Sequence, residues 1–224
     1  MDNFNFLNKT LNISEIFYSI QGEGTRTGMP CVFVRLAGCN LRCKWCDTIY
    51  AQDINSEQKM SFNEILEKIY SYDCDFIEFT GGEPLMQEQV VELMNFIAQK
   101  KFTVAIETNG TFSIKELSPN IIKIIDIKCP SSNMEKYNLW ENFQHITKND
   151  ELKFVVASEE DFAWSEEIIV RHKLLEKTPN ILFSAISSCF SYEKLAKLIL
   201  NSNCNYRMQL QLHKIIWGED SVGV

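Results

Sequence analysis

The sequence predicts an α/β fold built around a mostly parallel β-sheet. Short runs rich in β-branched and aromatic residues recur along the chain, and stretches with apolar residues at helical spacing lie between several of them. Strands that alternate with helices form right-handed βαβ units, which place the strands side by side and parallel. The 224 residues are 45% hydrophobic and 23% charged, which is ordinary for a globular protein. We expect about six parallel strands in a single domain spanning residues 1–224.

The first predicted strand covers residues 12–20, whose alternating pattern indicates a strand or one arm of a hairpin. Residues 21–30 contain several glycines and predict a loop. Residues 31–36 (CVFVRL) are almost continuously apolar, which is typical of a strand buried on both faces of a parallel sheet. Further strands are predicted where similar runs recur, at 76–79, 102–106, 121–127, 151–156, 180–184 and 207–212.

Helices are predicted between several of these strands. Ser61 and Glu64 fit a capping box, in which each side chain accepts a hydrogen bond from the backbone of the other residue. Phe62, Ile65 and Leu66 follow at helical spacing, so we expect a helix that begins at this box. The other predicted helices cover 87–100, 161–177 and 191–200.

This order of elements fits either an open doubly wound sheet or an incomplete (β/α) barrel, because six or seven strands are too few for the closed eight-stranded barrel. Either architecture places ligands at the carboxyl ends of the strands. Arg35 and the segments 80–82, 107–109 and 126–128 all lie at or just past a predicted strand end. These residues are therefore candidates for a binding site.

The formal charge at pH 7 is −8, from 22 basic and 30 acidic residues. A nucleic-acid-binding surface normally carries clustered Lys and Arg, but the longest basic runs are the short segments 100–101 and 171–173. No apolar run approaches the ~20 residues that span a bilayer, and the N-terminal residues lack the pattern of a signal peptide. We expect a cytoplasmic protein with reduced thiols that binds neither nucleic acid nor a membrane.

Three cysteines lie close together in residues 38–48, at Cys39, Cys43 and Cys46, with the spacing CxxxCxxC. Thiolates are the usual ligands of iron–sulfur clusters, and three of them leave one iron of a 4Fe–4S cluster open for an outside ligand. A zinc site would require a fourth Cys or His at matched spacing, and none lies nearby. A disulfide framework would be typical of a secreted protein. The loop therefore predicts a cluster.

The CxxxCxxC loop, with Trp45 before its last cysteine, resembles that of the radical S-adenosylmethionine enzymes. The resemblance implies a partial (β/α) barrel with the cluster loop after its first strand. It also implies that S-adenosylmethionine binds the open iron and is cleaved to a 5′-deoxyadenosyl radical. In such enzymes the protein positions the cofactor and excludes water.

Further motifs resemble one family, the 7-carboxy-7-deazaguanine synthases. The resemblance implies a lyase that converts 6-carboxy-5,6,7,8-tetrahydropterin to 7-carboxy-7-deazaguanine with loss of ammonia, a step in the biosynthesis of 7-deazapurines such as queuosine. It further implies Mg²⁺, a flavodoxin- or ferredoxin-like electron donor and a homodimer. The motifs are EIFYSIQGEG (15–24), FVRLAGCNLRCKWCDTIYA (33–51), TGGEP (80–84), ETNG (107–110), CPSS (129–132), LKFVV (152–156) and QLHKIIWG (211–218).

By this resemblance, Glu107 and His213 are candidate catalytic groups that handle protons, and a structural role is the alternative for His213. Arg35 is expected to bind the substrate carboxylate through a charge-assisted pair, and an ion pair at the sheet edge is its alternative. Besides Arg35, the expected substrate contacts are Ile20, Gln21, Gly22, Thr80 and the C-terminal carboxylate of Val224.

The same resemblance assigns the cofactors. Thr48 is the expected Mg²⁺ ligand, with a turn-capping role as its alternative. The chain departs from the family pattern at DIKCPSSN (126–133), where Asp126 and Cys129 differ. The expected S-adenosylmethionine contacts are Trp45, Cys46, Asp47, Gly82, Asp126, Ile127, Lys128, Lys153, Phe154, Val155 and Val156.

Two other functions share the three-cysteine loop. A radical S-adenosylmethionine activase or tRNA-modifying enzyme would act on a macromolecule, whereas Arg35, Thr48 and the QGEG motif favour a small acidic substrate. A non-catalytic iron–sulfur electron-transfer protein would need a fourth cysteine ligand, which the loop does not supply.

Overall fold

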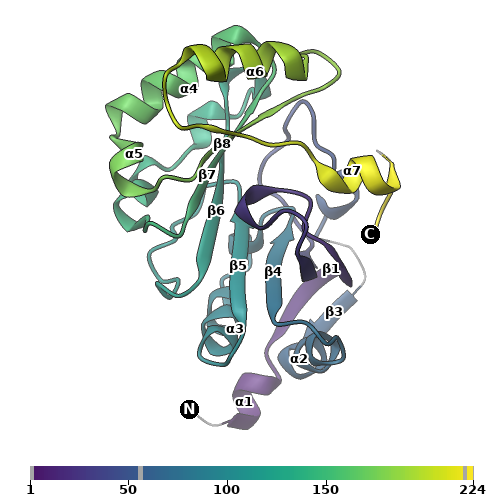
Figure 1. Ribbon diagram of the computed structural model, residues 1–224. Coiled ribbons are helices and arrows are strands. Elements are labelled where there is room, and N and C mark those ends of the chain that lie inside the picture. The colour runs from purple at the N-terminus through teal and green to yellow at the C-terminus, as the bar shows by residue number, and fades with distance from the viewer. Residues whose placement is uncertain (1–2, 55–57, 219–220, 224) are drawn as a thin grey trace.

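The computed structural model describes residues 3–54, 58–218 and 221–223, and these residues form an α/β fold around one nine-stranded sheet (Figure 1). The strands are β1 (Thr10–Ile20), β2 (Pro30–Leu36), β3 (Gln58–Ser61), β4 (Phe76–Gly81), β5 (Thr103–Thr108), β6 (Ile122–Ile127), β7 (Glu151–Val156), β8 (Ile181–Ala185) and β9 (Arg207–Met208). The helices are α1 (Asn3–Leu7), α2 (Phe62–Tyr70), α3 (Gln89–Ala98), α4 (Glu159–Arg171), α5 (Leu174–Lys177), α6 (Tyr192–Asn201) and α7 (Leu212–Trp217).

The sheet runs in the order β3-β1-β2-β4-β5-β6-β7-β8-β9. The seven strands β2-β4-β5-β6-β7-β8-β9 are parallel to their neighbours in the sheet. In contrast, β1 pairs antiparallel with both β2 and β3. Among the described residues β3 and β9 remain at opposite edges, so the sheet is open. The prediction of an α/β fold with a mostly parallel sheet is confirmed, and the cysteine loop follows the first parallel strand.

The predicted capping box forms at the start of α2. The Ser61 hydroxyl accepts a hydrogen bond from the Glu64 backbone N–H, and the Glu64 carboxylate accepts one from the Ser61 N–H at 2.7 Å. One predicted helix, 161–177, is instead two helices, α4 and α5. They are separated at Lys173, whose φ of +53° cannot continue a right-handed helix.

Alternate residues of each strand face two different environments, because successive side chains point to opposite faces of a sheet. On β4, Ile77 and Phe79 pack in the large core that the helices cover, whereas Phe76 belongs to a smaller apolar cluster on the opposite face. Glu78 and Thr80 share that opposite face and lie nearer the carboxyl end of the strand. The face is therefore apolar at one end and polar at the other.

The last helix, α7, lies apart from the other helices, on the right of Figure 1 beside β1. None of its residues is buried. Across the described ranges, every helix is too short or too polar to cross a membrane.

Candidate active site

A cavity of about 450 Å³ opens on the polar part of this face, at the carboxyl ends of the parallel strands. Of the predicted site residues that the structure describes, all but Phe154 and Val156 line it. Phe154 and Val156 are fully buried in the helix-covered core, so along β7 only Lys153 and Val155 face the cavity. Val224 lies outside the described residues.

The three cysteines of the CxxxCxxC loop lie on one wall of the cavity, and each is half-buried. Burial raises the pKa of the Cys39 and Cys43 thiols, and the nearby ammonium of Lys128 opposes that rise. Within the described ranges no three Cys, His, Asp or Glu side chains are arranged to hold a single metal ion. A cubane spreads its ligands over separate irons, so its thiolates stand farther apart than the ligands of one ion. Three soft donors on one wall fit such a cluster.

The TGGEP segment supports the cysteine loop through backbone contacts. The Glu83 N–H donates to Gly38 O at 2.8 Å, and the Gly38 N–H donates to Ala51 O at 2.8 Å. A Cβ at Gly82 would overlap the Gly38 carbonyl oxygen and would lie 2.8 Å from Ala51 O. The loop can approach this closely only because residue 82 is glycine.

Lys153 is the centre of a buried charge network on the cavity floor. Its Nζ lies 2.9 Å from Glu23 Oε2, in contact with Glu107 Oε1, and 4.0 Å from Asp126 Oδ2. Burial by itself would lower the pKa of Lys153, but Glu107, Glu23 and Asp126 outweigh it and raise that pKa well above its usual value. The lysine is therefore an ammonium that holds three carboxylates from three different segments.

Glu23 connects the QGEG loop to the C-terminal segment. Its carboxylate accepts hydrogen bonds from Gln209 Nε2 at 2.9 Å and from Gln211 Nε2 at 2.7 Å. Next to it, the Leu212 N–H donates to Gly22 O at 2.9 Å, and a Cβ at Gly22 would overlap the His213 ring. These contacts bring His213 to the cavity wall.

His213 is half-buried and faces the cavity. Burial lowers its pKa, against the opposing effect of Glu23, so the imidazole is uncharged at neutral pH. Glu107 lies on the same cavity, where Thr80 Oγ1 donates to its Oε2 at 3.4 Å. A neutral imidazole and a carboxylate are a suitable pair for proton transfer.

Asp126 and Lys128 lie between the cysteine loop and the lysine network. Lys128 Nζ is 2.8 Å from Asp126 Oδ2, while Asp126 Oδ1 is buried without a hydrogen-bond partner in the described parts of the chain. A buried unsatisfied oxygen costs free energy. It can accept a hydrogen bond from an amino or hydroxyl group of a ligand beside the cluster loop.

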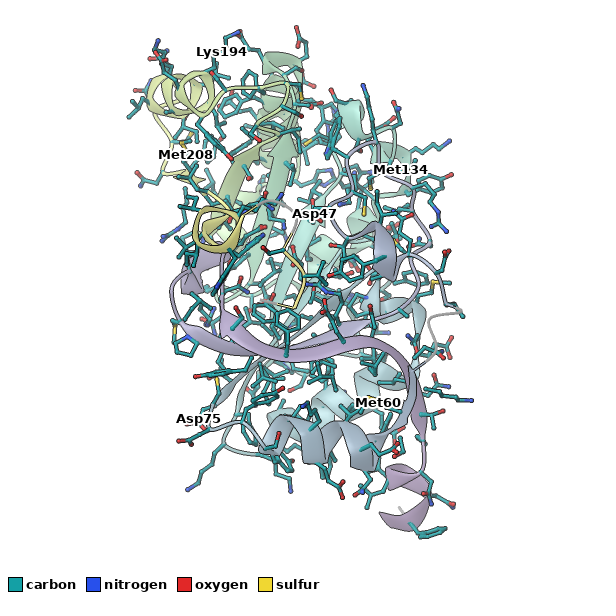
Figure 2. All side chains as sticks on the ribbon, turned by 90° about the vertical axis from the view of Figure 1, so that its right-hand side faces the viewer. Asp47, Met60, Asp75, Met134, Lys194 and Met208 are labelled. Carbon is teal, nitrogen blue, oxygen red and sulfur yellow. The ribbon has the colours of Figure 1, made fainter. Side chains whose placement is uncertain are left out.

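Asp47 and Thr48 follow the last cysteine, and Asp47 appears near the centre of Figure 2 beside the C-terminal segment. Thr48 Oγ1 donates to Asp47 Oδ1 at 3.0 Å, and Lys214 Nζ lies 3.6 Å from Asp47 Oδ2. Burial alone would raise the pKa of Asp47, but Lys214 and the Thr48 hydroxyl outweigh it and hold the carboxyl below its usual pKa. These hard oxygen donors suit Mg²⁺.

Arg35 both lines the cavity and forms an ion pair. Its Nε lies 2.7 Å from Glu15 Oε1, its partner across the β1–β2 pair, so the alternative of an ion pair at the sheet is present. The described residues offer no hydrogen-bond acceptor to the two terminal nitrogens of the guanidinium. Those nitrogens remain able to bind an acidic ligand in the cavity.

Sequence reasoning missed three acidic residues around the cavity, of which Glu78 and Glu83 are buried. Glu23 belongs to the QGEG motif and Glu83 to TGGEP, and each motif could have indicated its acid. Burial raises the pKa of Glu83 to about 7, and its carboxyl accepts hydrogen bonds from the Asn109 N–H at 2.7 Å and Thr108 Oγ1 at 2.8 Å. The signal for Glu78 was weaker: one charged residue within the apolar run FIEF.

Comparison with known proteins identifies the family. The family model described as the radical SAM superfamily matches residues 34–148. A protein of Chlorobaculum tepidum described as 7-carboxy-7-deazaguanine synthase is 41% identical over 218 residues, which cover 96% of this chain and 97% of that protein. One of Clostridium acetobutylicum with the same description is 37% identical, over 95% and 98% of the two chains.

The crystal structure of QueE from Escherichia coli has the same fold, with a TM-score of 0.77 and 23% identity over 95% of this chain and 99% of that chain. The sequence relatives span nearly the whole chain at more than a third identity. The aligned region includes the cysteine loop, the lysine network and the C-terminal segment, which together line the cavity. The chain therefore belongs to the 7-carboxy-7-deazaguanine synthase family, within the radical SAM superfamily.

Proposed function

We propose that this protein converts 6-carboxy-5,6,7,8-tetrahydropterin to 7-carboxy-7-deazaguanine with loss of ammonia. Family membership supports the reaction. The observation that carries it is one cavity that contains the three-cysteine loop, an arginine for an acidic ligand, and the Glu23–Lys153–Glu107 network. Substrate and product differ by one molecule of ammonia, so the overall reaction needs no net oxidant.

In this proposal Cys39, Cys43 and Cys46 would hold a 4Fe–4S cluster. Asp126 Oδ1 would be one acceptor for the polar groups of S-adenosylmethionine. When bound, this pair supplies the one-electron chemistry that removes a hydrogen atom from the substrate. The protein's own task is to hold the substrate next to it and to exclude water.

The substrate carboxylate binds the terminal nitrogens of Arg35, because a guanidinium matches a carboxylate with two parallel hydrogen bonds. The pterin ring lies against Ile20, Gln21, Gly22 and Thr80. Glu107 takes up a proton from the ring system, and the ammonium of Lys153 fixes the position of that carboxylate. The neutral imidazole of His213 is the second proton-handling group.

In this proposal Thr48 would hold Mg²⁺ together with oxygen donors of the substrate and water, which are the ligands that this ion prefers. The carboxylate of Val224 is proposed as a further substrate contact. A flavodoxin- or ferredoxin-like electron donor and a homodimer are proposed from the family resemblance alone.

The test is an anaerobic assay of the reconstituted, reduced protein with S-adenosylmethionine, Mg²⁺ and 6-carboxytetrahydropterin, with the product identified by mass spectrometry. We expect 7-carboxy-7-deazaguanine over many turnovers per cofactor. Thr48→Ala should abolish the stimulation by Mg²⁺, whereas the matched variant Thr48→Ser, which keeps a hydroxyl, should retain it. Release of 5′-deoxyadenosine without any deazaguanine would contradict the proposed substrate and would favour an activase or a tRNA-modifying enzyme.

A further inference from the structure

Arg35 is held in place by Glu15 and Tyr50, neither of which is among the predicted site residues. Glu15 Oε1 lies 2.7 Å from Arg35 Nε and also accepts a hydrogen bond from the Tyr50 hydroxyl at 2.7 Å. Glu15 and Arg35 are directly opposed on β1 and β2, so the sheet register itself places the acid next to the guanidinium. One carboxylate oxygen thus joins Arg35 to Tyr50.

Aromatic rings restrict the guanidinium further. Arg35 Cζ lies 5.7 Å from the centroid of the Phe17 ring and 5.9 Å from that of Tyr50, within the range of a cation–π contact. Only 16% of the Arg35 side chain is exposed. With Nε bound to Glu15, the guanidinium keeps its terminal nitrogens for the cavity. A side chain already fixed in this way loses little rotamer entropy when a ligand binds.

Tyr50 links this arrangement to the cysteine loop. It lies in the short 3-10 helix Ile49–Ala51, directly after residues 38–48. The carbonyl of Ala51 accepts from the N–H of Gly38, at the start of the loop, at 2.8 Å. The position of the Tyr50 hydroxyl therefore depends on the conformation of the loop that carries the cluster ligands.

Tyr50 is a hydrogen-bond donor under all ordinary conditions. Burial raises its pKa, and the hydrogen bond to Glu15 raises it further, against the opposing charge of Arg35. A phenol that stays protonated can hold Glu15 in place but adds no charge beside the substrate. Its effect on Arg35 is thus one of position.

We propose that Glu15 and Tyr50 are positioning residues that aim Arg35 at the substrate carboxylate, so that the folded cluster loop makes the cavity select carboxylated pterins. This inference rests on the proposed function, because it takes the acidic ligand of Arg35 to be the pterin carboxylate. A hydrogen bond to a charged group contributes enough to change a dissociation constant roughly tenfold.

The experiment is anaerobic equilibrium binding to the cluster-loaded, S-adenosylmethionine-bound protein, with two ligands. These are 6-carboxytetrahydropterin and tetrahydropterin, which lacks the carboxylate. Tyr50→Phe removes only the hydroxyl and should weaken binding of the carboxylated ligand about tenfold, while binding of tetrahydropterin changes less than about twofold. Glu15→Gln should act in the same direction, and the double variant should be no weaker than the worse single variant, because both act through Arg35.

Tyr18→Phe is the matched control, since Tyr18 lies on the same strand as Glu15 and is exposed like Tyr50, but stacks on Tyr72, away from Arg35. It should leave both dissociation constants unchanged. Equal weakening of the two ligands by Tyr50→Phe, or no weakening of either, would overturn the inference. Failure of the unaltered protein to bind either pterin would instead overturn the proposed function.

The role of the cysteine loop in positioning Arg35 is tested separately, by measuring the preference for the carboxylated ligand without the cluster. In cluster-free protein we expect the preference for the carboxylated ligand to fall to within about twofold, because the ordered loop no longer fixes Tyr50. A preference as large as that of the cluster-loaded protein would show that Arg35 is positioned without the loop.

Discussion

Glu78 is an acid in a position where a charge is costly. It is 1% exposed, lies above the apolar cluster that contains Phe33 and Ala105, and has no cation within 4 Å in the described residues. Its Oε2 accepts a hydrogen bond from Gln21 Nε2, and Gln21 Oε1 accepts one from the Glu23 N–H at 3.0 Å. Burial, and next the charge of Glu107, raise the pKa of Glu78 well above its usual value. Folding therefore favours the protonated form of this carboxyl, which orients the Gln21 amide.

A raised carboxyl pKa in the folded state makes stability fall with rising pH. Below the unfolded pKa of about 4.5 both states bind the proton, whereas above it the unfolded state releases the proton that the folded state keeps. Glu78→Gln removes this effect and keeps the acceptor for Gln21. Compared with the unaltered protein, the variant should therefore gain free energy of unfolding as the pH rises from 4 to 8.

Urea unfolding of the cluster-free proteins across this pH range measures the difference. Glu159→Gln, at an exposed helical position, is the control and should show no such trend. If the Glu78→Gln difference stays constant with pH, then folding does not raise the pKa of Glu78.

Between elements, the cysteine loop approaches the residues after β4 closely. Gly82→Ala would place a methyl group against Gly38 O and near Ala51 O, which are backbone atoms that cannot rotate away. We expect a loss of about 1–3 kcal/mol in stability. The displaced loop should also retain less iron per chain after reconstitution, measured by iron analysis.

Gly28→Ala is the control that distinguishes backbone strain at a glycine from steric overlap of the added methyl group. Gly28 has a φ of +90°, so alanine is strained there, but nothing lies within 4 Å of its added Cβ. This variant should lose stability and keep its full iron content. Equal iron contents in the two variants would contradict a specific role of Gly82 in supporting the loop.

The strands and main helices could be predicted from the sequence because they are long, apolar and periodic. The short strand β3 and the helices α1 and α7 could not, and α7 buries no residue that would show periodicity. The last strand was predicted at 207–212 but ends at Met208, because Gln209 and Gln211 turn their amides to Glu23 and Leu212 begins α7.

The rule that ligands bind at strand ends correctly placed Thr80, Glu107 and Asp126 on one cavity. The resemblance to the family assigned the continuous segment 153–156 to the cofactor, and a motif does not separate the two faces of β7, so Phe154 and Val156 were included with Lys153. The pairing of Glu15 with Arg35 depends on strand register, and the burial of Glu78 depends on its neighbours in space. Neither property is visible in a single sequence.

At the scale of the whole molecule, the cavity joins distant parts of the chain. Glu23 bonds Lys153 and, from the C-terminal segment, Gln209 and Gln211, which are 186 and 188 residues away in sequence. In contrast, α7 exposes Ile215, Ile216 and Trp217. The polar contacts of Gln211, the Leu212 backbone N–H and Lys214 with the cavity wall are therefore its main attachment.

An element attached by a few polar contacts opens at low free energy, whereas a strand inside a sheet opens only with the global fold. In hydrogen exchange measured by mass spectrometry, a peptide covering 211–218 should exchange much faster than one covering β7 in the ligand-free protein. It should gain protection when cluster, S-adenosylmethionine and pterin are bound, because His213 and Lys214 then lie against an occupied cavity. Glu23→Gln, which weakens the attachment at Gln211, should reduce that gain. Exchange at 211–218 as slow as that of β7 without ligands would show that α7 is held by the core and not by the site.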